Sequence, residues 1–317
     1  MAVITLGSLT DLEKTSYVRE GLPVAKPKLI YSQYAVKDRV AKREGKTRQW
    51  FRMTKVGIES GSNFLSTATY VKNSTGAAPT FTPATPGDTT LTAQVDFLFG
   101  KGHEWNEGVE YTSFADLPKE LRTLNHLHAA EAIDTEVRSV VTAGTNVMYA
   151  NGRATRPNLL STDQVDMNDI FDAVTVLRNN DAPEINGMYS ALCSANVIAQ
   201  LMKDTAFQNA IQTQKNYIFS GTIAELYGVR FNFTSRAATT SNGGSASQIA
   251  TIDQTIITGD NAYGKTAWML DDFDIVYTGP GGWGDEYKTR HALTWKYMFK
   301  SLILNQDWLV RLESSRA

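Results

Sequence analysis

The stretch spanning residues 118–150, PKELRTLNHLHAAEAIDTEVRSVVTAGTNVMYA, decides the fold. Its first part carries apolar residues at helical spacing, with Pro118 suited to the first turn and Gly144 to the C-terminal cap. This pattern predicts a helix over residues 118–143, about 39 Å long at 1.5 Å per residue. A helix of that length needs a sheet or a second helix to pack against for most of its course.

Three further helices are predicted on the C-terminal side of this stretch. Asp166 and Ser194 are placed to cap two of them, and a capping-box pattern begins at Thr205. Residues 229–234 alternate apolar and polar side chains as a half-buried strand does, and residues 290–313 are rich in aromatic and β-branched residues typical of strands. The chain is therefore predicted to be α+β, without the regular alternation of strand and helix that builds a parallel sheet.

On the N-terminal side, positive charge is concentrated between residues 26 and 55. This segment holds ten Lys or Arg residues against two acidic ones, a local charge of +8 in a chain of net charge -2. Such asymmetry favours an arm or edge that meets an acidic partner, either nucleic acid or a neighbouring subunit; a solvated basic face would give the same pattern. The candidate subunit-interface residues in this segment are Lys37, Arg39, Lys42, Arg43, Arg48, Trp50, Arg52 and Lys55.

Residues 57–92 differ in composition from the rest of the chain: Ser, Thr, Gly and Pro are the dominant residues there. Strand-like runs flank this stretch at residues 47–53 and 91–99, both rich in aromatic or β-branched residues. A connection of this length inside a compact domain usually has a role of its own. We therefore expect an extended hairpin that projects from the body.

Overall composition excludes several classes of protein. The net charge of -2 excludes a strongly basic nucleic-acid binder. Cys193 is the sole cysteine and cannot form an internal disulfide; its apolar neighbours predict a small buried hydrophobe in a reducing compartment. Residues 1–7 lack the basic start of a secretory signal, and no apolar run reaches the length of about 18 residues that a membrane helix needs.

One stretch matches a phosphate-binding loop. Residues 259–266, GDNAYGKT, run from Gly259 to Thr266 and fit the pattern G-x-x-x-x-G-K-[ST] after a strand-like segment. That motif also needs a helix beginning at the lysine, so that aligned backbone N–H groups face the phosphates. Here the following residues predict turn and strand, and fewer than 60 residues remain after the motif. A hairpin turn is the preferred interpretation.

No other pattern predicts catalysis or metal binding. Asp271, Asp272 and Asp274 lack the spacing and glycine of a calcium loop. His126 and His128 are two apart on the long helix, so they point about 200° from each other and cannot share a metal ion. The sequence predicts no cofactor, no metal and no catalytic residue, and therefore no enzyme.

Several stretches give the sequence a likeness to a known family. They are YVREGLPVAKPKLIYSQY (17–34), GKTRQWFR (45–52), VTAGTNVMYA (141–150), DMNDIFDAVTVLRNN (166–180), KDTAF (203–207), SGTIAELYGVRF (220–231), GDNAYG (259–264) and TWKYMFKSLILNQDWLVRLES (294–314). In this order they resemble the major capsid proteins of tailed bacteriophages with the Hong Kong 97-like fold, in particular the phage N-four type of coat protein. The GDNAYG stretch belongs to that family pattern, which argues against nucleotide binding. The likeness is poorest over residues 57–106.

The resemblance implies a division of the chain and a set of partners. The implied parts are an N-terminal arm (1–45), an E-loop hairpin (46–111), a peripheral domain with a long spine helix (112–165), an axial domain (166–279) and the C-terminal strands of the peripheral domain (280–317). The implied partners are other copies of the chain in hexamers and pentamers, a scaffold, a portal, decoration proteins and packaged double-stranded DNA, with no membrane. The implied location is the virion, and the host bacterial cytoplasm during assembly. The first alternative function is the shell of an encapsulin-like compartment, which shares the fold. The second alternative is a nucleotide-binding enzyme that uses Gly259–Thr266.

Overall fold

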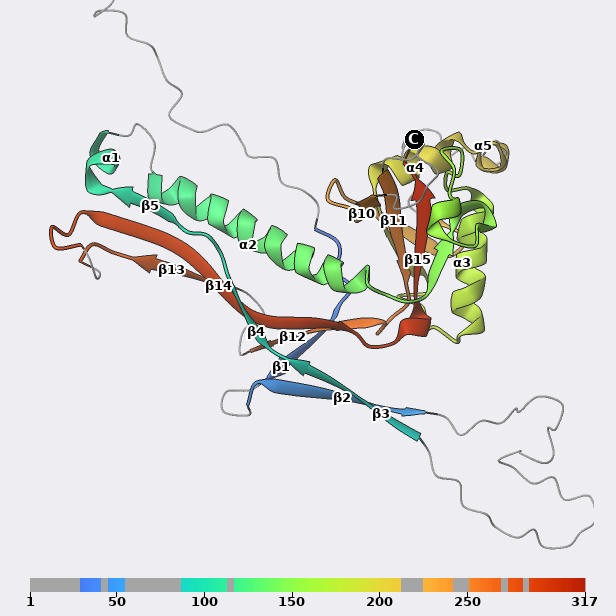
Figure 1. Cartoon of the computed structure of the whole chain (residues 1–317), viewed down its shortest axis with the longest axis horizontal. Coiled ribbons are helices and arrows are strands. Elements are labelled where there is room, and N and C mark those ends of the chain that lie inside the picture. Colours follow the sequence, from blue (N-terminus) through green and yellow to red (C-terminus); the bar gives the residue numbers. More distant parts are fainter. Residues whose placement is uncertain are drawn as a thin grey trace, which may run out of the picture. The chain divides into compact units, whose positions relative to one another are not determined.

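The computed structural model describes residues 29–40, 45–54, 87–112, 117–211, 225–241, 251–268, 273–281 and 285–316. The described residues form two compact units. Unit 1 holds those within Leu98–Ile133 and Asp272–Tyr297; unit 2 holds those within Leu29–Phe97, Asp134–Asp271 and Met298–Ala317. Helices and strands follow one another irregularly along the chain (Figure 1), which confirms the predicted α+β class. The five-part division drawn from the sequence stays a prediction.

A seven-stranded sheet is the centre of unit 2. Its order is β6 (Val147–Tyr149), β15 (Leu309–Ser315), β11 (Thr251–Thr258), β7 (Tyr189–Cys193), β9 (Val229–Phe233) and β8 (Glu225–Leu226), with β10 (Thr239–Ser241) beside β11. Strand β15 runs parallel to β6 and β7 runs parallel to β9, whereas β11 is antiparallel to both β7 and β15. Side chains on both faces of β7 and β11 are buried, so this sheet is covered on two sides.

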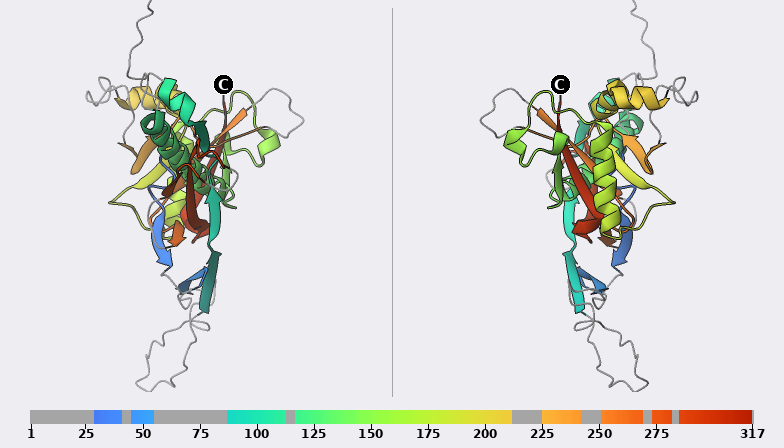
Figure 2. Two further views of the ribbon diagram at one scale, coloured as in Figure 1. Left: turned by 90° about the vertical axis from the view of Figure 1, so that its left-hand side faces the viewer. Right: turned by 90° about the vertical axis from the view of Figure 1, so that its right-hand side faces the viewer.

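Helices α3 (Met167–Asn179) and α4 (Ala195–Lys203) pack against this sheet and form the main core of unit 2. Figure 2 shows α3, in yellow-green, standing beside the strands. The side chains that meet in this core include Ile170, Val174, Leu177, Val197, Leu201, Val229, Ile257, Val310 and Leu312. Cys193 belongs to the same cluster and is fully buried as a free thiol, which confirms its prediction as a small buried hydrophobe.

Both helices begin where their sequence caps predicted. Asp166 accepts a hydrogen bond from the N–H of Asp169 at 2.8 Å, and the Asp169 carboxylate accepts one from the N–H of Asp166 at 3.2 Å, which completes a capping box. Ser194 Oγ accepts from the N–H of Val197 at 3.3 Å. These bonds satisfy backbone donors that the first turn of a helix otherwise leaves unpaired.

The cap predicted for the third helix was wrong. Helix α5 spans Thr205–Ile211, and Asp204 rather than Thr205 caps it. The Asp204 carboxylate accepts from the N–H of Ala206 at 3.0 Å, and its carbonyl accepts from the N–H of Gln208 at 2.9 Å. An ionised carboxylate suits the positive end of a helix, so the helix begins one residue earlier than the capping-box pattern indicated.

The long helix α2 spans Leu117–Val141 and confirms the central prediction, ending two residues early. Gly144 was predicted at the C-terminal cap, where glycine commonly takes a positive φ, but its φ is not positive. A Cβ atom on Gly144 would lie 2.9 Å from Leu309 Cδ2, so this position needs glycine for close packing. The Thr142 hydroxyl donates to the carbonyl of Arg138 at 2.9 Å and closes the last turn instead.

Strand β1 (Val36–Val40) leads into a two-stranded hairpin in unit 2. Strand β1 pairs in parallel with β12 (Tyr263–Trp268), which is antiparallel to the last part of β14 (Arg290–Ile303). Next along the chain, β2 (Thr47–Thr54) and β3 (Gly87–Gln94) pair antiparallel from Thr47 opposite Gln94 to Thr54 opposite Gly87. The strands predicted at the base of the hairpin are therefore present, while residues 55–86 lie outside the described part of the chain.

In unit 1, the beginning of β14 pairs with β5 (His103–Asn106) and β13 (Asp274–Thr278), and the end of β4 (Asp96–Phe99) also belongs to this unit. The short helix α1 (Glu107–Thr112) follows β5 in the chain. The first turns of α2 pack on these strands. The Asn125 side chain donates to the carbonyl of Leu293 at 3.2 Å, and Trp295 Nε1 donates to His128 Nδ1 at 3.0 Å. The strands predicted over residues 290–313 are confirmed as β14 and β15.

The first described residues of unit 2 are held by a buried anchor. Ile30 and Tyr31 are fully buried. Tyr31 Oη accepts from the N–H of Ala238 at 3.0 Å, and the Tyr31 carbonyl accepts from Tyr263 Oη at 2.7 Å. Burial raises the pKa of Tyr31 to about 12. Both partners lie more than 200 residues away in sequence, so the anchor forms only in the folded unit.

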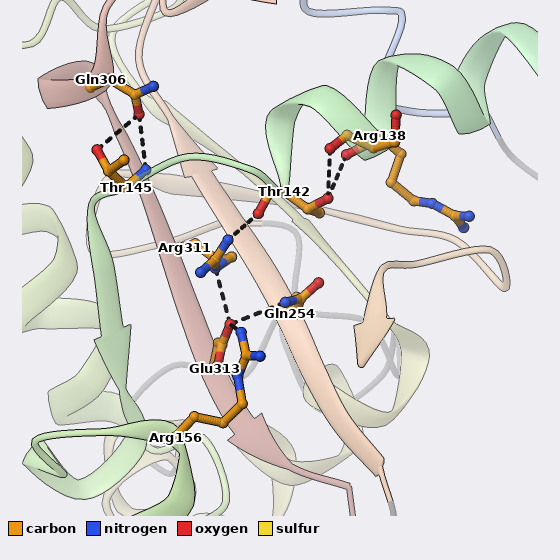
Figure 3. Close-up of polar contacts among 9 residues, drawn as sticks. Arg138, Thr142, Thr145, Arg156, Gln254, Gln306, Arg311 and Glu313 are labelled. Carbon is orange, nitrogen blue, oxygen red and sulfur yellow. Dashed lines mark hydrogen bonds and ion pairs between the residues drawn. The ribbon is translucent and has the colours of Figure 1, made fainter. Parts of the chain in front are cut away.

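A buried ionic network joins β15 to the loops around it (Figure 3). The Glu313 carboxylate is fully buried and accepts two hydrogen bonds of 2.6 Å from Arg156, which lies in the short 3-10 helix Arg156–Asn158. Gln254 of β11 donates a third at 3.0 Å, and Arg311 forms an ion pair with Glu313 at 3.0 Å. Arg311 also donates to the carbonyl of Thr142, so the network ties β15 to the end of α2. Burial raises the pKa of Glu313, but the hydrogen bonds from Arg156 and Gln254 outweigh burial and lower it overall.

Candidate assembly surface

Five of the eight predicted interface residues lie on two strands that follow one another in the chain. Lys37 and Arg39 lie on β1, while Arg48, Trp50 and Arg52 lie on β2 of the hairpin. The other three candidates, Lys42, Arg43 and Lys55, lie outside the described residues. The basic segment thus includes the strand that precedes the hairpin and the first strand of the hairpin itself.

The hairpin presents its basic residues on one face. Successive side chains of a strand point to opposite faces, so Arg48, Trp50 and Arg52 share one face of β2. Across the pair, Trp50 lies opposite Leu91, and both side chains are only half-buried. The face therefore combines cations with an aromatic and an aliphatic side chain, a composition that is typical of protein interfaces.

One of these cations already has a partner within the chain. Arg48 donates to both carboxylate oxygens of Asp38, with Nε at 2.7 Å and Nη2 at 3.3 Å. Their side chains are 42% and 24% exposed, so the pair lies at the surface. Asp38 is one of the two acidic residues of the basic segment, and no sequence pattern indicates that it faces Arg48. The geometry assigns Arg48 a role in holding β2 beside β1.

The two cations of β1 are both exposed. Lys37 and Arg39 are exposed and alternate with the half-buried Asp38, so they share the outer face of the strand. In the parallel register Lys37 lies opposite Lys265 of β12, and Arg39 lies opposite Ala267. Lys37 and Arg39 remain candidates for contact with an acidic surface.

Sequence reasoning missed two exposed aromatic side chains in unit 2. Phe51 of β2 is 59% exposed, and Phe97 of β4 is 58% exposed. Phe51 lies on the hairpin face opposite to Trp50, because it is the next residue along the strand. The sequence places them in strand-like runs but does not show which face of each strand is covered.

The phosphate-loop pattern lies in a connection between strands. Strand β11 ends at Thr258 and β12 begins at Tyr263, so Lys265 lies inside a strand and is 8% exposed. A backbone in that conformation does not aim successive N–H groups at a phosphate as a helix start does. The chain there lacks the geometry that the motif needs.

The preferred interpretation of Gly259–Lys265 as a hairpin turn was also wrong. Strand β11 pairs with β7, β10 and β15, whereas β12 pairs with β1 and β14, so the turn connects two different sheets. The N–H of Gly259 donates to the carbonyl of Trp308 at 3.0 Å, and that of Asp260 donates to Pro183 at 2.8 Å. These contacts with distant loops fix the direction of the turn, and no local pattern reveals them.

The remaining polar candidates have structural partners. Asp274 pairs with Lys296 at 3.5 Å, while Asp271 and Asp272 lie outside the described residues. His126 contacts the ring of Phe273, and His128 that of Trp295. Across the described ranges, no group of three or more His, Cys, Asp or Glu side chains could hold a metal ion. Within the same ranges, no helix is both long and apolar enough to cross a membrane.

Comparison with known proteins identifies the architecture. No protein-family model matches the sequence, and no curated protein matches it. Solved structures do match along almost the whole of both chains. The capsid of cyanophage Pam1 aligns with a TM-score of 0.73 at 10% identity, covering 100% of each chain. The chain has the fold of phage capsid proteins.

Two further capsid structures support this assignment of the fold. The head of Helicobacter pylori bacteriophage KHP40 aligns with a TM-score of 0.71 at 11% identity, covering 99% of each chain. The capsid of Ralstonia phage GP4 aligns with a TM-score of 0.70 at 13% identity, covering 100% of this chain and 98% of that one. The Hong Kong 97-like capsid fold predicted from the sequence is confirmed. At such low identity the likeness concerns the backbone, because most side chains differ.

Proposed function

We propose that this chain is the major capsid protein of a tailed phage, which assembles into the hexamers and pentamers of an icosahedral head around double-stranded DNA. The end-to-end match with phage capsid chains, complete in both directions for the cyanophage Pam1 capsid, carries this proposal. The chain would act by binding copies of itself and would catalyse no reaction. It would reside in the virion, after assembly in the cytoplasm of the host bacterium.

The parts of the fold suit the roles that capsid assembly requires. The β2–β3 hairpin continues into residues 55–86 and would be the E-loop over residues 46–111. Helix α2 would be the spine helix of a peripheral domain over residues 112–165, which the strands after residue 280 complete. The seven-stranded sheet with α3 and α4 would form the axial domain over residues 166–279, and residues 1–45 the N-terminal arm.

The basic segment would contact neighbouring subunits. Lys37 and Arg39 offer exposed cations on β1, and Trp50 with Arg52 offers an aromatic and a cation on the hairpin. Lys42, Arg43 and Lys55 would extend this surface. A surface ion pair contributes only about 0–1 kcal/mol, but a closed shell repeats each contact at every equivalent position, so small contributions accumulate. Packaged DNA, a scaffold, a portal and decoration proteins would be the other partners.

Assembly of the purified protein tests the function. We expect capsomers or closed shells by negative-stain microscopy and light scattering, for the protein alone or expressed with a partner scaffold. A monomer at every protein and salt concentration, with and without scaffold, would contradict the proposal.

Charge reversal tests the surface separately. The double variant Lys37→Glu, Arg52→Glu should give normal circular dichroism but a reduced yield of shells. Lys203→Glu, an exposed cation on α4 outside the basic segment, is the matched control and should assemble normally. Normal shells from the double variant that retain less DNA would instead mean that the basic segment faces the genome.

A further inference from the structure

Two turns of unit 2 carry an asparagine followed by a glycine, and they share one backbone conformation. Asn151 and Gly152 have φ values of 56° and 62°, while Asn186 and Gly187 have φ values of 53° and 80°. Positive φ at both central residues is typical of a type I′ turn. A backbone hydrogen bond closes each turn, from the N–H of Arg153 to Ala150 at 3.4 Å and from that of Met188 to Ile185 at 3.2 Å. The two turns are therefore directly comparable.

An asparagine that precedes a glycine can lose its amide group without an enzyme. The glycine nitrogen forms a bond to the asparagine Cγ, while the Cγ–Nδ2 bond breaks and ammonia leaves with the proton of the glycine N–H. Water then opens the cyclic imide at either carbonyl carbon, which gives aspartate or isoaspartate. Glycine has no Cβ to hinder the attack. With ψ at 30°, as at Asn151, the glycine nitrogen points away from Cγ, so the turn has to open before the reaction starts.

The Asn151 turn is fixed by two carboxylates. Asn151 Nδ2 donates to Asp163 at 3.0 Å, and the N–H of Asn151 donates to Asp169 at 3.0 Å. Asp163 is only 1% exposed and is held in turn by Arg153, which donates from Nε at 2.8 Å and from Nη2 at 3.2 Å. The amide of Asn151 therefore has to leave a buried, charged acceptor before its Cγ can meet the nitrogen of Gly152.

The Asn186 turn lacks such restraints. Asn186 and Gly187 are both exposed, and no hydrogen bond joins the Asn186 side chain or the Gly187 N–H to another described residue. The bonds between Ile185 and Met188 form an isolated bridge that belongs to no strand. A Cβ on Gly187 or on Gly152 would meet nothing within 4 Å, so crowding at the glycine does not distinguish the two turns. The Asn186 turn should open at the lower cost, because fewer contacts hold it.

We propose that Asn186 is a site of spontaneous deamidation and that Asn151, in the same kind of turn, is protected from it. Water is the sole co-reactant, so the reaction does not depend on the proposed function. The new carboxylate would lie two residues after Glu184, beside the surface pair that Glu184 forms with Arg178. Isoaspartate would also lengthen the main chain by one methylene group just before β7, a strand whose side chains are all buried. Deamidation at Asn186 would therefore strain the entry to the central sheet of unit 2.

Peptide mapping of the stored full-length protein tests the proposal. The folded protein is kept in a mildly alkaline buffer, and fragmentation mass spectrometry follows the change from amide to acid at each asparagine. Because a hydrogen bond to a charged group has to break at Asn151, we expect Asn186 to react at least about tenfold faster. In urea, which opens both turns, the two sites should react at similar rates. A third pair, Asn242–Gly243, lies outside the described residues and is scored separately in the same maps.

Two variants check the assignment. Asn186→Ser removes the reacting amide, so methylation by an isoaspartate methyltransferase should fall relative to the wild type. Asp163→Asn removes the charge that holds Asn151 and should raise the rate there toward that of Asn186; if this variant does not fold, the comparison in urea decides alone. Equal rates at the two sites in the folded wild type would overturn the proposal. So would a folded protein in which both sites stay intact while both react in urea, because the closed turn would then protect Asn186 as well. Unequal rates in urea would also overturn it, because the flanking sequence would then set the difference.

Discussion

Replacing Glu313 by glutamine tests whether the buried network stabilises the fold. The change keeps the size of the side chain but removes the charge that accepts two hydrogen bonds of 2.6 Å from Arg156. The new amide nitrogen would face a guanidinium, which has only donors. Breaking a buried ion pair by removing one partner costs about 3–5 kcal/mol. The Arg156 side chain is 32% exposed and can be partly rehydrated, so we expect the lower end, about 3 kcal/mol.

Urea unfolding of the unassembled protein, followed by circular dichroism, measures this free energy. A loss of about 3 kcal/mol corresponds to a fall in the melting temperature of roughly 6–12 °C. Asp38→Asn is the matched control: it breaks the more exposed pair with Arg48 and should cost only about 0–1 kcal/mol. If Glu313→Gln lowers stability by no more than Asp38→Asn does, the network does not stabilise the fold as we argue.

Acid should remove the difference between wild type and Glu313→Gln. The folded state lowers the pKa of Glu313 below its ordinary value, since the hydrogen bonds from Arg156 and Gln254 outweigh the effect of burial. The carboxylate therefore contributes its stability above the pKa of the unfolded chain and loses it as the pH falls through the pKa of the folded state. The unfolding free energies of the two proteins should converge in acid. A difference that stays constant down to the acid transition would contradict the lowered pKa.

Three further predictions concern single positions. Burial raises the pKa of Asp169 to about 7. The protonated carboxyl therefore contributes its full stability below pH 3.8 and loses it as the pH rises through 7. Asp169→Asn should remove this decline, which is at most about 4 kcal/mol, when the free energy of unfolding is measured from pH 4.5 to 8. A flat wild-type profile would refute this. Gly259→Ala should cost about 1–3 kcal/mol in thermal unfolding, because its Cβ would lie 2.7 Å from the Pro183 carbonyl. Calorimetry should detect no ATP or GTP binding to the wild type or to Gly259→Ala. Saturable binding by the wild type would support the nucleotide-binding alternative. Tyr31→Phe should cost about 1 kcal/mol, because it leaves the N–H of Ala238 without its acceptor, and an unchanged melting temperature would exclude this role.

The elements that sequence predicted well are those whose signals are local. The main helices were predicted nearly to the residue from Pro118, the helical spacing after it, and the caps Asp166 and Ser194. A cap and the backbone N–H group that donates to it lie within one turn. The cap at Thr205 failed for a related reason. The preceding Asp204 offered a charged acceptor in the same turn, and the pattern did not weigh the two against each other.

The two misinterpreted glycines show what local patterns leave out. Gly144 and Gly259 were interpreted as turn or cap residues, yet each is needed because a distant group approaches its Cα: the Leu309 side chain and the Pro183 carbonyl. The assembly surface has the same limit. The basic residues were evident from composition, but the pairing of Arg48 with Asp38 depends on the folded positions of two strands that belong to different sheets.

The anchor at Tyr31 lies where tension on the preceding residues would enter unit 2. A fully extended chain of 28 residues, the number before Leu29, spans at most about 100 Å. Tension along residues 1–28 would reach Tyr31, whose hydroxyl and carbonyl are both hydrogen-bonded inside unit 2. It would not act on an exposed edge strand that could separate from its sheet. Detachment would require the Tyr31 ring to leave the core and break both bonds at once. If a neighbouring subunit binds residues 1–28, the force that this contact withstands would depend on the buried core of unit 2 around Tyr31 rather than on surface contacts.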